Sequence, residues 1–170
     1  AFVRQLDEKW PDVSDDALMD QLGEWLSPYV DGMKSLADLK RLPLGEALEA
    51  LLPWPARKDL DALAPAYWTA PSGSRLPIDY SDPHAPAINV RLQELFGLAD
   101  TPRIAGGRGP LTLRLLSPAH RPVQVTRDLA GFWRNAYFEV RKDLKGRYPK
   151  HYWPVNPLEA EAVRGTKPRK

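Results

Sequence analysis

The stretch from which we build the fold is Leu116–Pro154, LSPAHRPVQVTRDLAGFWRNAYFEVRKDLKGRYPKHYWP. Val123 and Val125 alternate with polar residues near its start, a pattern typical of a short strand. A helix should follow, with Thr126 as N-cap and Asp128 in the first turn, where the helix dipole favours a carboxylate. The stretch therefore joins a strand to a long helix.

The predicted helix has one apolar stripe. Apolar side chains recur at intervals of three and four residues, as in a helix that packs on a protein body. The stripe consists of Leu129, Phe132, Trp133, Ala136, Val140 and Leu144. Gly131 lies inside it and costs about 1 kcal/mol relative to alanine unless a neighbour packs closely against it. Gly146 and Pro149 predict the end of the helix.

Short strands are expected before this stretch. Leu111, Leu113 and Leu115 alternate with Thr112 and Arg114, which predicts a half-buried strand. Further elements are expected at 75–80 (strand), 89–96 (helix, closed by Gly97), 101–105 (strand) and 106–109 (turn). Several short strands with one small helix predict a small, partly open β-barrel, OB-like or SH3-like, over residues 67–126.

The first part of the chain, residues 1–66, is predicted to be helical. Helices are expected from the N-cap Ser14 to a stop at Pro28, and over 33–42, 44–52 and 57–64. We expect a small helical bundle in which Trp10, Trp25 and Trp54 serve as packing aromatics. The predicted fold class is therefore α+β: the bundle, the small barrel, and a third segment, 127–170, with the long helix and a basic, aromatic tail packed on the body.

Charge is distributed unevenly along the chain. Residues 1–66 hold 7 basic and 13 acidic side chains, a net charge of −6, whereas residues 67–170 hold 17 and 9, a net charge of +8. This asymmetry favours contact between the second half and a polyanion. Two solvated faces of different charge, or attraction between the halves, would give the same pattern.

Composition excludes several kinds of chemistry. The chain has no cysteine, which excludes disulfides, thiolate catalysis and cysteine-ligated metals and is compatible with the cytoplasmic location that we expect. No apolar run approaches the roughly 20 residues that a membrane span needs. The sequence starts with Ala1 in place of methionine, so we expect a piece of a longer chain.

No catalytic, cofactor-binding or metal-binding site is predicted. His84, His120 and His151 lack the spacing of metal ligands. The glycine-rich turn at 106–109 lacks the lysine and hydroxyl residues that end a phosphate-binding loop, and no nucleophile-elbow sequence is present.

Nucleic-acid contact is the function that the residues favour most. From His120 to Trp153 there are eight basic and three acidic side chains. Basic groups neutralise phosphates, and aromatic rings stack on unpaired bases. The candidate nucleic-acid-binding residues are Arg121, Arg134, Arg141, Lys142, Lys145, Arg147, Tyr148, Lys150, His151, Tyr152 and Trp153. In the alternative interpretation, the charges form a solvated helix face and Tyr148, Tyr152 and Trp153 clamp the tail onto the body.

Several long motifs resemble one family. The segments LSPAHRPVQVTRDLAGFW and RYPKHYWP resemble the C-terminal end of the HrpB-type bacterial ATP-dependent RNA helicases, members of the DEAH/DExH superfamily 2 group. The segments RLQELFGLADTP, PSGSRLPIDY and WPDVSDDALMDQLGEWLSPYV resemble the same region. The resemblance therefore extends over almost the whole chain.

The resemblance implies a parent protein with two upstream ATPase lobes that use ATP and magnesium, and a barrel that matches an OB-like module near the RNA exit. The phosphate-binding lysine loop, the DExH box and the arginine fingers are absent from these residues, so no ATP hydrolysis is expected here. We expect a non-catalytic auxiliary C-terminal region that contacts RNA, positions the ATPase lobes, or does both. The alternative is a platform for a protein partner that does not touch nucleic acid.

Overall fold

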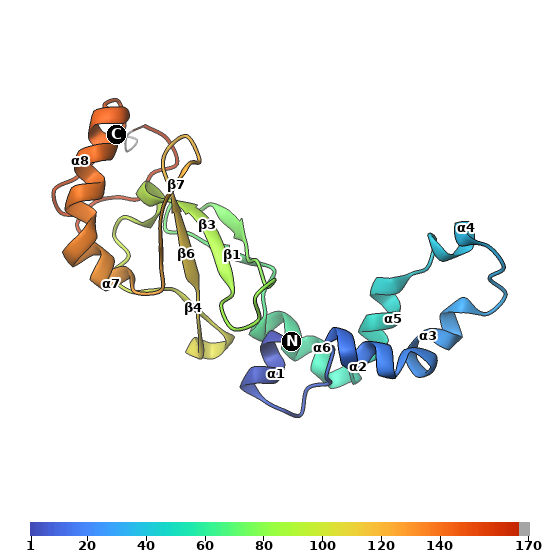
Figure 1. Ribbon diagram of the computed structural model, residues 1–170. Coiled ribbons are helices and arrows are strands. Elements are labelled where there is room, and N and C mark those ends of the chain that lie inside the picture. Colours follow the sequence, from blue (N-terminus) through green and yellow to red (C-terminus); the bar gives the residue numbers. More distant parts are fainter. Residues whose placement is uncertain (167–170) are drawn as a thin grey trace. The chain divides into compact units, whose positions relative to one another are not determined.

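The computed structural model describes residues 1–166, and for Trp54 it describes the backbone alone. The packing role predicted for the Trp54 side chain therefore lies outside the described part. The basic residues Lys167, Arg169 and Lys170 lie outside it as well. The chain divides into two compact units, Ala1–Ala64 and Pro65–Lys170. The first is helical and the second contains the strands (Figure 1).

The helical unit consists of short helices. They are α1 (Phe2–Leu6), α2 (Asp15–Asp20), α3 (Leu22–Val30), α4 (Leu36–Leu39), α5 (Leu44–Ala50) and α6 (Trp54–Leu63). Among its described apolar side chains, only Phe2, Val3 and Ala47 are buried, whereas Met19 and Leu36 remain 66% and 79% exposed. Most described apolar side chains of this unit are therefore half-buried or exposed.

The helix expected from Ser14 to Pro28 is interrupted. Ser14 caps α2 as predicted, because its side chain accepts a hydrogen bond from the backbone of Ala17. The indole Nε1 of Trp25 donates to the carbonyl of Leu18 at 2.9 Å, and this carbonyl would pair with a backbone N–H in a continuous helix. Pro28 does not stop α3 but lies inside it.

The strands of the second unit form three small, separate sheets. Two are antiparallel pairs, β1 (Tyr67–Thr69) with β2 (Arg75–Pro77) and β4 (Arg103–Ile104) with β5 (Gly109–Pro110). The third has the order β3-β6-β7, in which β6 (Thr112–Leu116) lies parallel to β3 (Ala87–Arg91) and antiparallel to β7 (Pro122–Thr126).

The barrel is not confirmed. The three-stranded sheet has the ends of its strand order at β3 and β7, and no closed barrel forms among the strands of the described residues. The mixed helix and sheet composition agrees with the predicted α+β class.

Residues 89–96 were predicted as a helix and instead complete a strand and a short turn. Ala87–Arg91 form β3, and Leu92–Leu95 form the 3₁₀ helix η1. Ile88 and Val90 are both 1% exposed and point to the same buried face, because side chains alternate along a strand. Gly97 ends the turn as predicted, with a φ of +80° that glycine adopts without strain.

The long helix is present but begins later than predicted and contains an irregular turn. Asp128, not Thr126, is its N-cap, since the Asp128 carboxylate accepts from the Gly131 N–H at 2.8 Å. The helix then runs through α7 (Leu129–Gly131), the π-helical η3 (Phe132–Ala136) and α8 (Tyr137–Arg147). The three segments lie along one side of the three-stranded sheet (Figure 1).

The π turn changes which side chain enters the core. The Tyr137 N–H bonds to the Phe132 carbonyl five residues earlier, which adds one residue to that turn. Tyr137 is therefore fully buried, while Ala136, which the regular stripe placed inside, is half-buried. The aromatic core around it is built from edge-to-face or tilted pairs of Phe96, Phe132, Trp133, Tyr137 and Tyr152.

Across the described residues, we find no helix with both the length and the apolar character that crossing a membrane requires.

Candidate nucleic-acid-binding site

The predicted site residues occupy two different environments. Six are exposed: Arg121, Arg134, Lys142, Lys145, Arg147 and Lys150. Four are half-buried: Arg141, Tyr148, His151 and Tyr152. Trp153 is buried. The structure therefore separates cations that face solvent from aromatic groups that contact the protein body.

The segment after α8 folds back along the helix. Trp153 is 7% exposed, and its indole Nε1 donates to the Tyr148 carbonyl at 2.9 Å. The Arg141 Nε donates to the Trp153 carbonyl at 3.1 Å, and the Tyr137 hydroxyl donates to the Pro154 carbonyl at 2.8 Å. Burial raises the pKa of Tyr137, which keeps this hydroxyl protonated as a donor. These contacts use Arg141 and Trp153 to hold the tail.

The rest of the tail is tied to loops far away in the sequence. The Gly97 N–H donates to the Pro157 carbonyl, and a Cβ atom at Gly97 would lie 3.3 Å from the Ala160 carbonyl oxygen. The Gln93 amide lies 3.4 Å from His151 Nδ1 and also bonds to the Gly165 carbonyl. Through these bonds, the tail covers the turn that follows β3.

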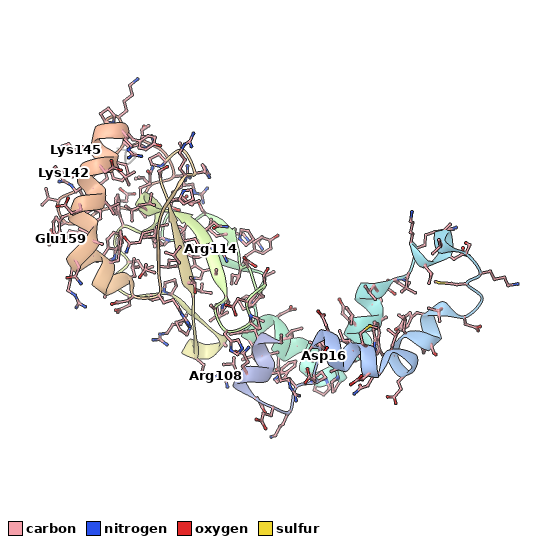
Figure 2. All side chains as sticks on the ribbon, viewed as in Figure 1. Asp16, Arg108, Arg114, Lys142, Lys145 and Glu159 are labelled. Atoms are coloured by element: carbon pink, nitrogen blue, oxygen red, sulfur yellow. The ribbon has the colours of Figure 1, made fainter. Side chains whose placement is uncertain are left out.

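A basic face remains on the outside of the helix, and we define it as Arg134, Phe138, Lys142 and Lys145. These positions are separated by four, four and three residues, so they follow one another along one side of the helix. The three cations are exposed and make no ion pair within the described part of the chain, and the Phe138 ring is 51% exposed. Figure 2 shows Lys142 and Lys145 projecting from α8.

Two other cations are arranged differently. Arg147 pairs with Asp143 one turn earlier, with 3.0 Å between Nε and Oδ1. Arg121 follows the turn between β6 and β7, where its N–H bonds to the Ser117 hydroxyl. Neither belongs to the basic face.

The prediction of site residues omitted Phe138. The sequence signal was an aromatic residue flanked at i−4 and i+4 by Arg134 and Lys142, outside the apolar stripe. Its exposure agrees with its place outside the predicted apolar stripe, on the same face as Arg134 and Lys145.

No group of three or more histidine, aspartate or glutamate side chains suited to a metal ion occurs among the residues that the structure describes. The fold defines an α+β region built of small sheets and one long helix, with an unpaired basic surface on that helix.

Comparison with known proteins identifies this region. A family model described as ATP-dependent helicase C-terminal matches residues 25–157. The ATP-dependent RNA helicase HrpB of Escherichia coli (strain K12) is 51% identical over 158 residues, which is 93% of this chain and 20% of that protein. The chain therefore belongs to the ATP-dependent helicase C-terminal family, which confirms the resemblance.

Solved structures agree with this assignment. A crystal structure of the E. coli DExH-box NTPase HrpB matches with a TM-score of 0.83 at 48% identity, over 96% of this chain and 20% of that one. A second, of the Escherichia coli DEAH/RHA helicase HrpB, matches with a TM-score of 0.66 at 48% identity, over 89% and 19%. The chain spans about a fifth of the length of these relatives.

Proposed function

We propose that this chain is an auxiliary C-terminal region of a bacterial ATP-dependent RNA helicase and that it contacts single-stranded RNA through the basic face of the helix. The observation that carries the proposal is the exposed Phe138 ring between unpaired cations. Arginine and lysine would neutralise phosphates, and the ring offers a surface on which an unpaired base stacks. ATP and magnesium would bind to ATPase lobes elsewhere in the longer protein.

The packed aromatic residues play another part in this proposal. Trp153 is buried and Arg141 bonds to its carbonyl, so both act by holding the tail. Tyr152 packs edge to face on Phe96, with 6.1 Å between ring centroids. RNA contact in this proposal therefore rests on the basic face, Arg134, Phe138, Lys142 and Lys145.

A second function, a protein-docking platform, is favoured by one feature of the helical unit. Leu36 and Leu39 of α4 are 79% and 49% exposed and line a shallow hollow with Val30 and Met33. Exposed apolar groups of this kind mark contact surfaces. In this alternative, the unit packs on the ATPase lobes or on a partner protein.

The test measures the affinity of the 170-residue chain for a fluorescein-labelled oligouridylate 12-mer over a salt series. We expect the logarithm of the affinity to fall linearly with the logarithm of salt concentration, since phosphate contacts release counterions. The double variant Lys142→Glu/Lys145→Glu should bind about tenfold more weakly, with a salt slope reduced by about 1 to 2. Phe138→Ala should bind about fivefold more weakly at unchanged slope, because it loses stacking and no charge.

A matched control carries the same charge change in the helical unit, Lys34→Glu/Lys40→Glu, and should stay within about twofold of the parent chain. If both double variants weaken binding equally, net charge and not the basic face determines affinity. No detectable binding at low salt would reject RNA contact and favour the docking platform.

A further inference from the structure

A cavity of about 380 Å³ lies between the β6–β7 hairpin and α8. Its lining includes the apolar side chains of Val123, Val140 and Leu144 and the ring of Tyr148. Arg141, whose side chain bonds to the tail, is not among its lining residues. A cavity of this size falls within the range of small-ligand sites. Its lining also includes the charged residues Arg121, Glu139, Asp143 and Arg147, so polar and apolar groups both face a ligand.

Two opposite charges at this cavity have no partner among the residues that the structure describes. Arg121 and Glu139 both line it, and neither side chain makes a hydrogen bond or ion pair to any described residue. They also do not pair with each other. Asp143 and Arg147, which line the same cavity, do form an ion pair at 3.0 Å. A ligand that offers acceptors to one group and donors to the other would bridge Arg121 and Glu139.

The hairpin holds Arg121 at this position. The Ser117 N–H donates to the Arg121 carbonyl at 2.9 Å, and the Arg121 N–H donates to the Ser117 hydroxyl at 3.2 Å. Ser117 is 3% exposed, and its hydroxyl lies 3.4 Å from that of Tyr148. The backbone of Arg121 is therefore fixed by bonds that do not involve its side chain, which remains available to a ligand.

We propose that this cavity binds one unpaired guanine base of the RNA that contacts α8. The O6 and N7 atoms of guanine accept from Arg121, and its N1–H and N2–H groups donate to the two oxygens of Glu139. The ring faces lie against the aliphatic walls and Tyr148. Adenine lacks the carbonyl, and uracil has one N–H between two carbonyls, so neither satisfies both charged groups. This inference rests on the proposed function, because the base arrives as part of bound RNA.

The test compares two labelled RNA 12-mers, oligouridylate and the same oligomer with one central guanosine, on the 170-residue chain. We expect about fivefold to tenfold tighter binding of the guanosine-containing oligomer, the discrimination typical of a bidentate contact. Inosine in place of guanosine lacks the N2 amino group and should lose most of this preference. Glu139→Gln and Arg121→Gln should each reduce the preference to less than about twofold.

The control variant is Glu161→Gln, an exposed acid in the tail that carries the same charge change and should keep the preference. Binding of both oligomers with equal affinity would overturn the guanine site and leave the proposed RNA contact intact. Binding of neither would overturn both. A preference that survives in the Glu139 and Arg121 variants would place the base elsewhere and also reject this cavity as its site.

Discussion

Gly131 shows how one residue depends on its neighbour at the start of the helix. The Asp128 carboxylate caps the helix by accepting from the Gly131 N–H, and a Cβ atom at Gly131 would lie 2.1 Å from Asp128 Oδ2. A Cβ atom there would force the Asp128 carboxylate out of its present position. Glycine lowers helix stability relative to alanine, but at position 131 it leaves room for the Asp128 cap.

We predict that Gly131→Ala destabilises the chain, although alanine is normally the better helix former. Displacing the cap should lower the free energy of unfolding by about 1 to 2 kcal/mol, and the close contact adds to this loss. Gly146→Ala is the control, because a Cβ atom there meets nothing within 4 Å. It should stabilise the chain by about 0.5 to 1 kcal/mol. Urea denaturation followed by circular dichroism measures both, and equal signs for the two variants would contradict the prediction.

The N-cap of the long helix is set in part by a residue from a distant loop. Thr126 and Asp128 are both good N-cap residues, and the spacing alone favoured the first. In the structure, the Thr126 hydroxyl accepts from the Asp128 N–H at 3.0 Å, and Thr101 donates its hydroxyl to the Arg127 carbonyl. Thr101 comes from a distant loop, so its contact with this turn was not visible in the local sequence.

At the scale of elements, η1 is held in place by a buried carboxylate. Glu94 is 2% exposed, and its two oxygens accept from Ser72 at 2.7 Å and from Arg91 at 2.8 Å. Burial by itself raises the pKa of Glu94, but hydrogen bonds from Ser74, Arg91 and Ser72 outweigh it, so the pKa lies below its usual value of 4.5. Glu94 thus links η1 to the turn between β1 and β2.

We predict that Glu94→Gln lowers the free energy of unfolding at pH 7 by about 2 to 4 kcal/mol, because it leaves Arg91 without its charged partner. The folded-state pKa of Glu94 is depressed, so its contribution is fully present above pH 4.5 and is lost as the pH falls through the folded-state pKa. The difference between parent and variant should therefore shrink below pH 4.5.

Denaturation midpoints at pH 7, 5 and 3.5 measure this difference. The exposed Glu161→Gln variant is the control and should match the parent chain at every pH. A difference between the parent chain and Glu94→Gln that stays constant from pH 7 to 3.5 would show that Glu94 acts by shape and not by charge.

The elements that were predicted correctly are those with long, regular patterns. The alternation of leucines predicted a half-buried strand, and β6 together with the residue before it has this pattern. The exposed fractions are 0% for Leu111, 0% for Leu113 and 1% for Leu115. The strand β3 was assigned to a helix because its burial depends on parallel pairing with β6, more than 20 residues later in the chain. The alternation of Ile88 and Val90 was the available signal, although so short an apolar run does not separate strand from helix.

At the scale of the whole molecule, most buried side chains lie in the unit Pro65–Lys170. This unit contains the aromatic core, all three sheets and the tail contacts. The described residues of the helical unit contribute three buried apolar side chains. The two units therefore differ strongly in the free energy that each gains from its own core.

We predict that residues 65–170 fold without the helical unit. The fragment should unfold cooperatively, within about 5 °C of the corresponding transition of the 170-residue chain, because its core is complete. Near-ultraviolet circular dichroism of the packed Trp133 and Trp153 measures this transition. Loss of that signal at all temperatures would show that the core needs the first unit.

By itself, the sequence determined the family, the uneven charge, strand β6 and the long helix. These depend on composition, on long motifs and on spacing between near neighbours, all of which a linear chain displays. Tertiary structure decided which members of Leu116–Pro154 are buried: Trp153 became a buried anchor, Arg141 its hydrogen-bond donor, and Tyr137 a core residue. The physical reason is that burial and hydrogen bonding here depend on the π turn and on partners such as Gln93 and Phe96, tens of residues distant in sequence.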